Sequence, residues 1–153
     1  MRKYFLIPGI AILGFLILFY ISNMFAPGSY PYAERYELPV DEPTLVALIN
    51  SFKDENPEYK VPDPNRLKDE RIGANGHWYR IYLYYPKENQ IVYIWTRPAG
   101  KKKTTLALVG FGYGLRLENW QLINKDFTST ENDEQKRKFE ERILSKIREK
   151  IKK

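Results

Sequence analysis

The chain has 153 residues, a formal net charge of +6 and no cysteine. Without cysteine it can form no disulfide, no thiolate nucleophile and no cysteine metal site, and it cannot be acylated as a bacterial lipoprotein. This length accommodates one folded domain with an appendage. The charge is uneven: Glu34 to Glu70 contain 5 basic and 10 acidic residues, whereas Arg71 to Lys153 contain 18 and 9. This polarity favours attraction of an acidic partner to the C-terminal half.

An apolar segment near the N-terminus predicts a membrane-spanning helix. Residues 5–24 read FLIPGIAILGFLILFYISNM and carry no charge. Twenty helical residues extend about 30 Å, which matches the hydrocarbon core of a bilayer. We therefore expect a transmembrane signal-anchor helix over residues 4–25, with lipid contacts through 5–24.

The charges on either side of this segment predict its orientation. Arg2 and Lys3 precede it, whereas Arg35 is the only basic residue between it and Lys53. By the positive-inside rule, residues 1–3 are cytoplasmic and the C-terminal domain is extracytoplasmic, in the periplasm of a bacterium with two membranes.

Two alternatives to an uncleaved anchor remain at this point. A cleaved signal peptide has a shorter apolar region, and a cut after Ala26 would place Met24 where a small residue is required. A buried helix of a soluble protein would normally show a polar face, and this segment has none. Both alternatives are less favoured than the anchor.

A Pro-rich stalk is expected over residues 26–40, followed by a folded domain over 41–153. The first helix of that domain begins at Asp41 or Glu42 and ends before Pro57, because proline disfavours helical geometry in the residue before it. Its apolar residues recur with helical spacing, at Leu45, Leu48, Ile49 and Phe52.

Aromatic and β-branched residues then predict strands. After an irregular connection over 58–76, with a short edge strand near 59–61, three runs read as strands at 78–85, 90–96 and 104–111. Short turns join them, which favours an antiparallel meander. The glycines at 110, 112 and 114 are expected to end the third strand, and residues 120–124 can form a fourth.

A second helix is expected from an N-cap at Thr130 to the C-terminus. Its apolar stripe consists of Phe139, Ile143, Leu144, Ile147 and Ile151. The predicted fold class is α+β: after the N-terminal transmembrane helix comes a small two-layer domain of helix, 3–4 stranded antiparallel meander and helix.

No pattern in the sequence indicates catalysis, a cofactor or a metal. His77 is the only histidine, and its neighbours Gly76 and Trp78 offer no partner for a base or a ligand. The run from Gly110 to Gly114 lacks the full GxGxxG spacing and is followed by no clear helix. We therefore expect no catalytic, cofactor-binding or metal-binding residues, no cofactor, and no enzymatic activity.

The predicted sheet carries a candidate binding face. Alternation along the first two strands separates an aliphatic face suited to the core from a face rich in Trp, Tyr and Arg, the residues enriched in binding hot spots. The second face comprises Trp78, Arg80, Tyr82, Tyr84, Tyr93, Trp95 and Arg97. The alternative is that the loop over 58–76 covers it.

These features predict a membrane-anchored, extracytoplasmic domain that binds another protein, such as an immunity-type inhibitor or an accessory subunit of an envelope complex. The alternative is a module that stacks a cell-wall glycan on the aromatic face. An enzyme of unknown type is least favoured. Nucleic acid is not expected as a partner, because the predicted topology separates it from the domain.

Overall fold

The computed structural model describes residues 13–18, 30–62, 67–71, 76–114 and 119–152. The chain divides into two compact units, Met1–Pro31 and Tyr32–Lys153. In the first unit, residues 13–18 are helical. All the strands and the remaining helices belong to the second unit.

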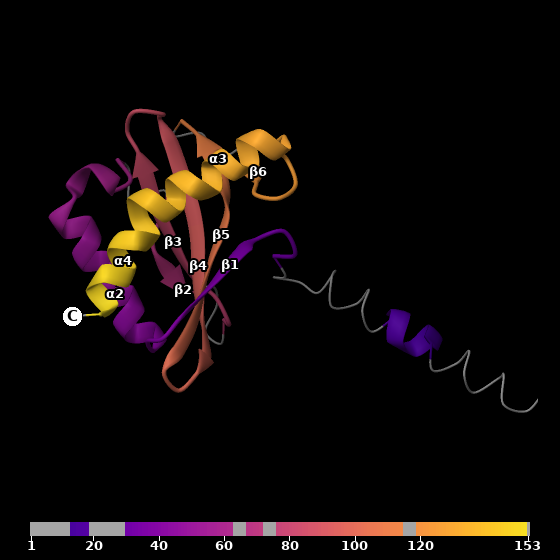
Figure 1. The fold of residues 1–153 in the computed structure, drawn as a ribbon. Helices are drawn as coiled ribbons and strands as arrows, with labels where there is room; N and C mark the ends of the chain where they lie inside the picture. Colours follow the sequence, from indigo (N-terminus) through magenta and orange to yellow (C-terminus); the bar gives the residue numbers. More distant parts are fainter. Residues whose placement is uncertain (1–12, 19–29, 63–66, 72–75, 115–118, 153) are drawn as a thin grey trace, which may run out of the picture. The chain divides into compact units, whose positions relative to one another are not determined.

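The second unit is built on one six-stranded antiparallel sheet (Figure 1). Its order is β1-β5-β4-β3-β2, and β6 pairs with β5 beyond the end of β1. The strands are β1 (Glu34–Leu38), β2 (Glu70–Arg71), β3 (Tyr79–Tyr85), β4 (Gln90–Gly100), β5 (Lys103–Tyr113) and β6 (Trp120–Leu122). β5 therefore pairs with three other strands.

Side chains at the helix N-termini define where the helices begin. Helix α2 (Glu42–Glu55) starts after Asp41, whose Oδ1 accepts a hydrogen bond from the Thr44 backbone N–H (3.1 Å). The short 3₁₀ helix η1 (Pro57–Tyr59) follows it. Helix α3 (Ser129–Phe139) begins after Thr128, two residues before the predicted cap, because Thr128 and Glu131 form a reciprocal capping box. It continues through a π-helical turn, η2 (Glu140–Leu144), into α4 (Ser145–Ile151).

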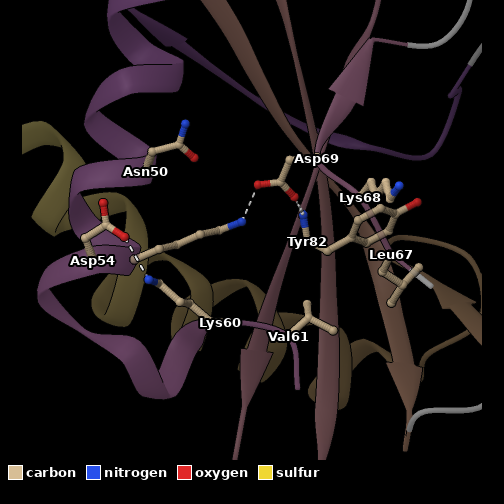
Figure 2. Close-up of a pocket in the computed structure, with 9 residues that line it drawn as sticks. Asn50, Asp54, Lys60, Val61, Leu67, Lys68, Asp69 and Tyr82 are labelled. Atoms are coloured by element: carbon tan, nitrogen blue, oxygen red, sulfur yellow. Dashed lines mark hydrogen bonds and ion pairs between the residues drawn. The ribbon is translucent and has the colours of Figure 1, made fainter. Parts of the chain in front are cut away.

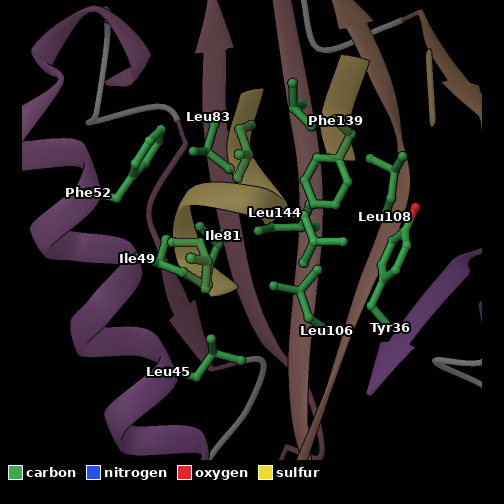
Figure 3. Close-up of a cluster of buried hydrophobic side chains, with 14 of the residues drawn as sticks. Tyr36, Leu45, Ile49, Phe52, Ile81, Leu83, Leu106, Leu108, Phe139 and Leu144 are labelled. Atoms are coloured by element: carbon green, nitrogen blue, oxygen red, sulfur yellow. The ribbon is translucent and has the colours of Figure 1, made fainter. Parts of the chain in front are cut away.

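The helices pack on one face of the sheet (Figure 3). Leu45, Ile49 and Phe52 from α2 meet Phe139 and Leu144 from the C-terminal helices over the strands. The strands contribute Tyr36, Leu38, Ile81, Leu83, Tyr85, Val92, Ile94, Leu106, Leu108 and Phe111. Burial of this apolar surface is the main stabilising contribution to the unit.

A bulge in β5 decides which of its residues face the helices. Tyr93 pairs with Gly110 but Ile94 pairs with Leu108, so Val109 is an extra residue in β5. Beyond the bulge the alternation is reversed: Phe111 enters the core and Gly112 lies on the opposite face. A Cβ on Gly112 would approach the Trp120 ring within 3.3 Å, and one on Gly110 would lie 2.3 Å from the Gln121 carbonyl oxygen. The glycines thus let β6 approach, and the strand continues to Tyr113 instead of ending at them.

The predicted order of helix, three- to four-stranded meander and helix is wrong. A strand, β1, precedes the first helix, within the range predicted to be a stalk, and β2 adds another edge strand at Glu70–Arg71. The prolines at 31 and 39 suggested an extended linker, but between them Tyr36 and Leu38 alternate into the core. Residues 59–61, expected as an edge strand, pair with no strand in the described sheet.

The structure also contradicts the predicted single-pass membrane topology. Of the predicted span 4–25, residues 13–18 are described as helix and the rest lies outside the described residues. Among the described residues, no helix is both long enough and apolar enough to cross a membrane. This finding contradicts the predicted signal-anchor helix. It also contradicts the cytoplasmic N-terminus and the extracytoplasmic domain, because both were deduced from that helix.

The close approach of β6 to β5 generates a stability prediction. Gly110→Ala should lower the free energy of unfolding by about 1–3 kcal/mol, because the clashing atom belongs to the backbone of β6 and cannot rotate away. Gly112→Ala is the matched control, since the atoms nearest to its Cβ, at 3.3–3.4 Å, belong to the Trp120 side chain and not to the backbone. Urea denaturation of the full chain measures both. A Gly110→Ala cost no larger than that of Gly112→Ala would contradict the close pairing of β6.

Candidate functional site

The sheet face opposite the helices, here called the outer face, carries the predicted binding residues. The strand register places Arg80 opposite Trp95 and Tyr82 opposite Tyr93. Thr96, the neighbour of Trp95, instead bonds to Glu42 on the helix side. The structure therefore brings together on the outer face all seven predicted residues, which are Trp78, Arg80, Tyr82, Tyr84, Tyr93, Trp95 and Arg97.

The centre of the outer face is buried even though none of the described helices covers it. Trp95 is 0% exposed and Tyr82 is 7% exposed. The Trp78 ring lies over Trp95, with ring centroids 4.0 Å apart, and the Arg97 guanidinium lies 4.6 Å from the centre of the Trp78 ring. The outer face is thus a second, smaller aromatic core, and only its margin is available to a partner.

Trp120 is an outer-face residue that the sequence patterns did not reveal. Its ring centroid lies 5.7 Å from that of Tyr93 and 6.1 Å from that of Tyr82, and the Tyr82 and Tyr93 rings stack at 5.1 Å. The available signal was the glycines at 110 and 112, at the end of the third predicted strand, which leave space for a large ring from a neighbouring strand. Trp120 occupies the space over Gly112.

The accessible margin of the outer face is formed by half-buried side chains, here called the rim. Arg80 is held by Glu70, with Nη2 2.6 Å from Oε1, and the Tyr84 hydroxyl donates to Asn89 Oδ1 (2.9 Å). The rim comprises Trp78, Arg80, Tyr84, Tyr93, Arg97 and Trp120. The rim combines packed aromatic rings with two arginines. Arg80 is held by its ion pair with Glu70, and Arg97 is held by its cation–π contact with Trp78.

A hollow of about 630 Å³ adjoins the outer face at the β3 edge of the sheet (Figure 2). It lies between α2 and Tyr82, which belongs to both surfaces. We call it the Lys53 hollow; its lining residues are Asn50, Lys53, Asp54, Lys60, Val61, Leu67, Lys68, Asp69 and Tyr82. Three lysines and two aspartates make its charged lining slightly basic.

Lys53 and Asp69 form the most deeply placed ion pair of this hollow. The Lys53 side chain is 11% exposed and that of Asp69 is 22% exposed. Asp69 Oδ1 also accepts the Tyr82 backbone N–H (2.9 Å), which occupies the β3 edge beyond the short β2. Burial lowers the pKa of the Lys53 ammonium, against the opposing effect of Asp69. The sequence held a signal for this residue, because Lys53 continues the apolar stripe of Leu45 and Ile49 in α2.

A second ion pair, in which the carboxylate is buried, has a structural role at the other end of α2. Glu42, which is 4% exposed, pairs with Arg71 of β2 and accepts a hydrogen bond from Thr96 Oγ1 (3.0 Å). Arg71 Nη1 also donates to the Gly76 carbonyl oxygen (3.2 Å). These contacts connect the first turn of α2 to β2 and β4, and they leave Glu42 fully engaged.

The described residues hold no group of three or more His, Asp or Glu side chains that could bind a metal ion. His77 is exposed, next to Trp78 at the start of β3. Comparison with known proteins finds no family model, no curated protein and no solved structure that matches this chain. The geometry of its own surfaces therefore carries the functional argument.

The burial of Trp95 generates a prediction. Trp95→Ala should lower the free energy of unfolding by about 3–5 kcal/mol, because truncation leaves a cavity beneath Trp78. Arg97→Ala is the control; it removes the cation–π contact with Trp78 and should cost about 0.5–1 kcal/mol. Chemical denaturation measures both. A Trp95→Ala cost below that of Arg97→Ala would contradict burial of the outer-face centre.

The Lys53–Asp69 pair predicts a pH-dependent effect. Asp69→Ala leaves a buried ammonium without its carboxylate and should cost about 3–5 kcal/mol near neutral pH. The folded-state pKa of Lys53, already lowered, falls further below its unfolded value of about 10.4. Between the two values the unfolded chain binds more protons, so the variant should gain stability as the pH rises through this window.

Urea midpoints of the Asp69→Ala variant between neutral and alkaline pH measure this gain. The matched control adds Lys53→Met to Asp69→Ala, which removes the ammonium and should remove the extra slope. The same pH slope in Asp69→Ala and in the double variant would show that Lys53 does not carry the effect.

Proposed function

We propose that residues 32–153 form a binding domain for another protein, and that the partner contacts the rim of the outer face. One observation carries this proposal: on the sheet face that no described helix covers, Trp78, Tyr93 and Trp120 lie half-buried beside Arg80 and Arg97. Trp, Tyr and Arg are the residue types that contribute most to protein–protein binding energy.

The packing beneath the rim supports the same function. The rim rings rest on Trp95 and Tyr82, which are buried, so a partner would meet side chains that are already ordered. Binding then loses less side-chain entropy than it would on a flexible surface. Arg97, stacked on Trp78, is likewise held in place before a partner arrives.

The distribution of charge favours an acidic partner surface. Arg80 and Arg97 lie on the rim, and the Lys53 hollow beside it adds Lys60 and Lys68. The excess of 18 basic over 9 acidic residues from Arg71 onward adds longer-range attraction. Such attraction raises the association rate and weakens as the ionic strength rises.

A glycan is the alternative ligand of the same surface. The partly exposed rings of Tyr93 and Trp120 favour it, since aromatic faces can stack on sugar rings. The two arginines argue for a protein, because guanidinium groups pair with carboxylates through directed hydrogen bonds. The test below separates these ligands.

The test is affinity capture on the immobilised full chain, from extracts of the source cells. Wild type should retain one polypeptide at a constant stoichiometry, and Tyr93→Ala and Arg97→Ala should each weaken its binding by about 2 kcal/mol, roughly thirty-fold. The matched control is Arg137→Ala, an exposed α3 arginine paired with Glu141 on the helix side. It should retain wild-type affinity, and added salt should weaken binding to the wild type.

Equal capture by wild type, both rim variants and the control would contradict a rim interface. Binding of purified oligosaccharides that is lost in Tyr93→Ala, with no retained polypeptide, would replace the protein partner by a glycan. The melting temperature of each variant is measured in parallel, so that loss of binding is not confused with loss of the fold.

A further inference from the structure

Helix α3 and strand β6 lie at the same end of the sheet (Figure 1). A separate hollow of about 470 Å³ is lined by residues of β5, β6 and α3. Tyr113 contributes from the end of β5, Gln121 from β6, and Glu131 and Gln135 from α3. We call it the Gln135 hollow; its described lining residues are Tyr113, Asn119, Gln121, Phe127, Glu131 and Gln135. It shares no residue with the outer-face rim or with the Lys53 hollow.

Gln135, which lines this hollow, has a side-chain oxygen without a hydrogen-bond partner. The residue is 9% exposed, and its Oε1 is buried with no hydrogen-bond partner. Buried polar atoms in folded proteins are nearly always paired, so the unpaired amide oxygen of this lining residue requires an explanation. A ligand that donates a hydrogen bond there, after a small rotation of the amide, supplies the missing partner.

The remaining lining residues restrict the chemistry of such a ligand. Asn119, Gln121 and Gln135 carry amides, each of which both donates and accepts hydrogen bonds, as the hydroxyl groups of a sugar also do. The Glu131 carboxylate, which also lines the hollow, disfavours an anionic ligand by charge repulsion. These groups suit a neutral ligand rich in hydroxyl groups.

Two aromatic residues and one carboxylate complete the arrangement. Tyr113 is 45% exposed, so its side chain is accessible to a ligand, and Phe127 is half-buried. Glu131 is held by Thr128, whose backbone N–H (3.1 Å) and Oγ1 (2.7 Å) both bond to Oε2. These hydrogen bonds lower the pKa of Glu131, so it is ionised at neutral pH and is a strong acceptor for hydroxyl donors.

We propose that the Gln135 hollow is a binding site for a neutral saccharide of one or two sugar units. Its volume lies within the range of about 300–1,000 Å³ that is typical of small-molecule sites. Tyr113 stacks on the apolar face of a sugar ring, Glu131 and the amides bond to its hydroxyl groups, and Gln135 accepts at the inner end. This site is distinct from the rim, and it does not depend on the function proposed for the rim.

The test is saturation-transfer NMR on the full chain, with a panel of methyl glycosides of glucose, galactose, mannose and N-acetylglucosamine and their disaccharides. At least one member should bind, and Tyr113→Ala and Gln135→Leu should each weaken that binding by about tenfold or more. Gln135→Leu replaces an unpaired buried amide by an apolar side chain of similar size, so its melting temperature should not fall. If Gln135→Leu does not fold, Tyr113→Ala still decides, because Tyr113 is exposed.

Arg97→Ala is the matched control, since it alters the rim and leaves the Gln135 hollow unchanged; it should bind the sugar as wild type does. The proposal is overturned if no panel member binds, or if binding persists unchanged in Tyr113→Ala and Gln135→Leu. Sugar binding that is lost in Arg97→Ala but retained in Tyr113→Ala would also overturn it, and would place the glycan on the rim. Failure of partner capture, with sugar binding intact, would affect only the function proposed for the rim.

Discussion

The burial of β5 on both of its faces is the constraint on which the rest of the structure depends. Every residue from Thr104 to Gly112 is buried, and the strand pairs with β1, β4 and β6. On one face the helices supply the cover, through contacts to Leu106, Leu108 and Phe111. On the other face, which no described helix covers, aromatic side chains pack against one another.

This second layer explains why the outer face resembles both a core and an interface. Trp95 and Tyr82 are buried by their neighbours Trp78 and Trp120, which remain half-exposed themselves. The Trp78 and Trp120 rings therefore pack on the buried residues with one side, and their other side forms an ordered part of the molecular surface. The bulge at Val109 makes this possible, because it turns Phe111 towards the helices and leaves glycine beneath Trp120.

The Lys53–Asp69 ion pair and the two hollows lie at the edges of the sheet, where strand pairing stops. β2 pairs with β3 over two residues, and beyond it Asp69 takes the Tyr82 backbone N–H that a longer strand would have paired. Lys53 compensates the charge of that carboxylate, and the Lys53 hollow forms beside the pair. At the opposite edge, β6 ends after three residues, and the Gln135 hollow opens between its strand and α3. Incomplete pairing thus leaves a hollow at both edges of the sheet.

The sequence by itself determined the elements whose signals are local. Asp41 and Pro57 delimited the first helix, and aromatic and β-branched residues identified the three central strands. Alternation along the first two of these strands indicated which of their faces meets the helices. It did not determine β1, which pairs with a strand nearly half the chain away, or the burial of Trp95, which depends on Trp78 folding back over it. Hydropathy over residues 4–25 predicted a membrane span that no described helix provides. Helix caps and strand alternation are signals that act over a few residues. The segments that pack on each face of β5 lie far apart in sequence, so only the tertiary structure decides which of them cover it.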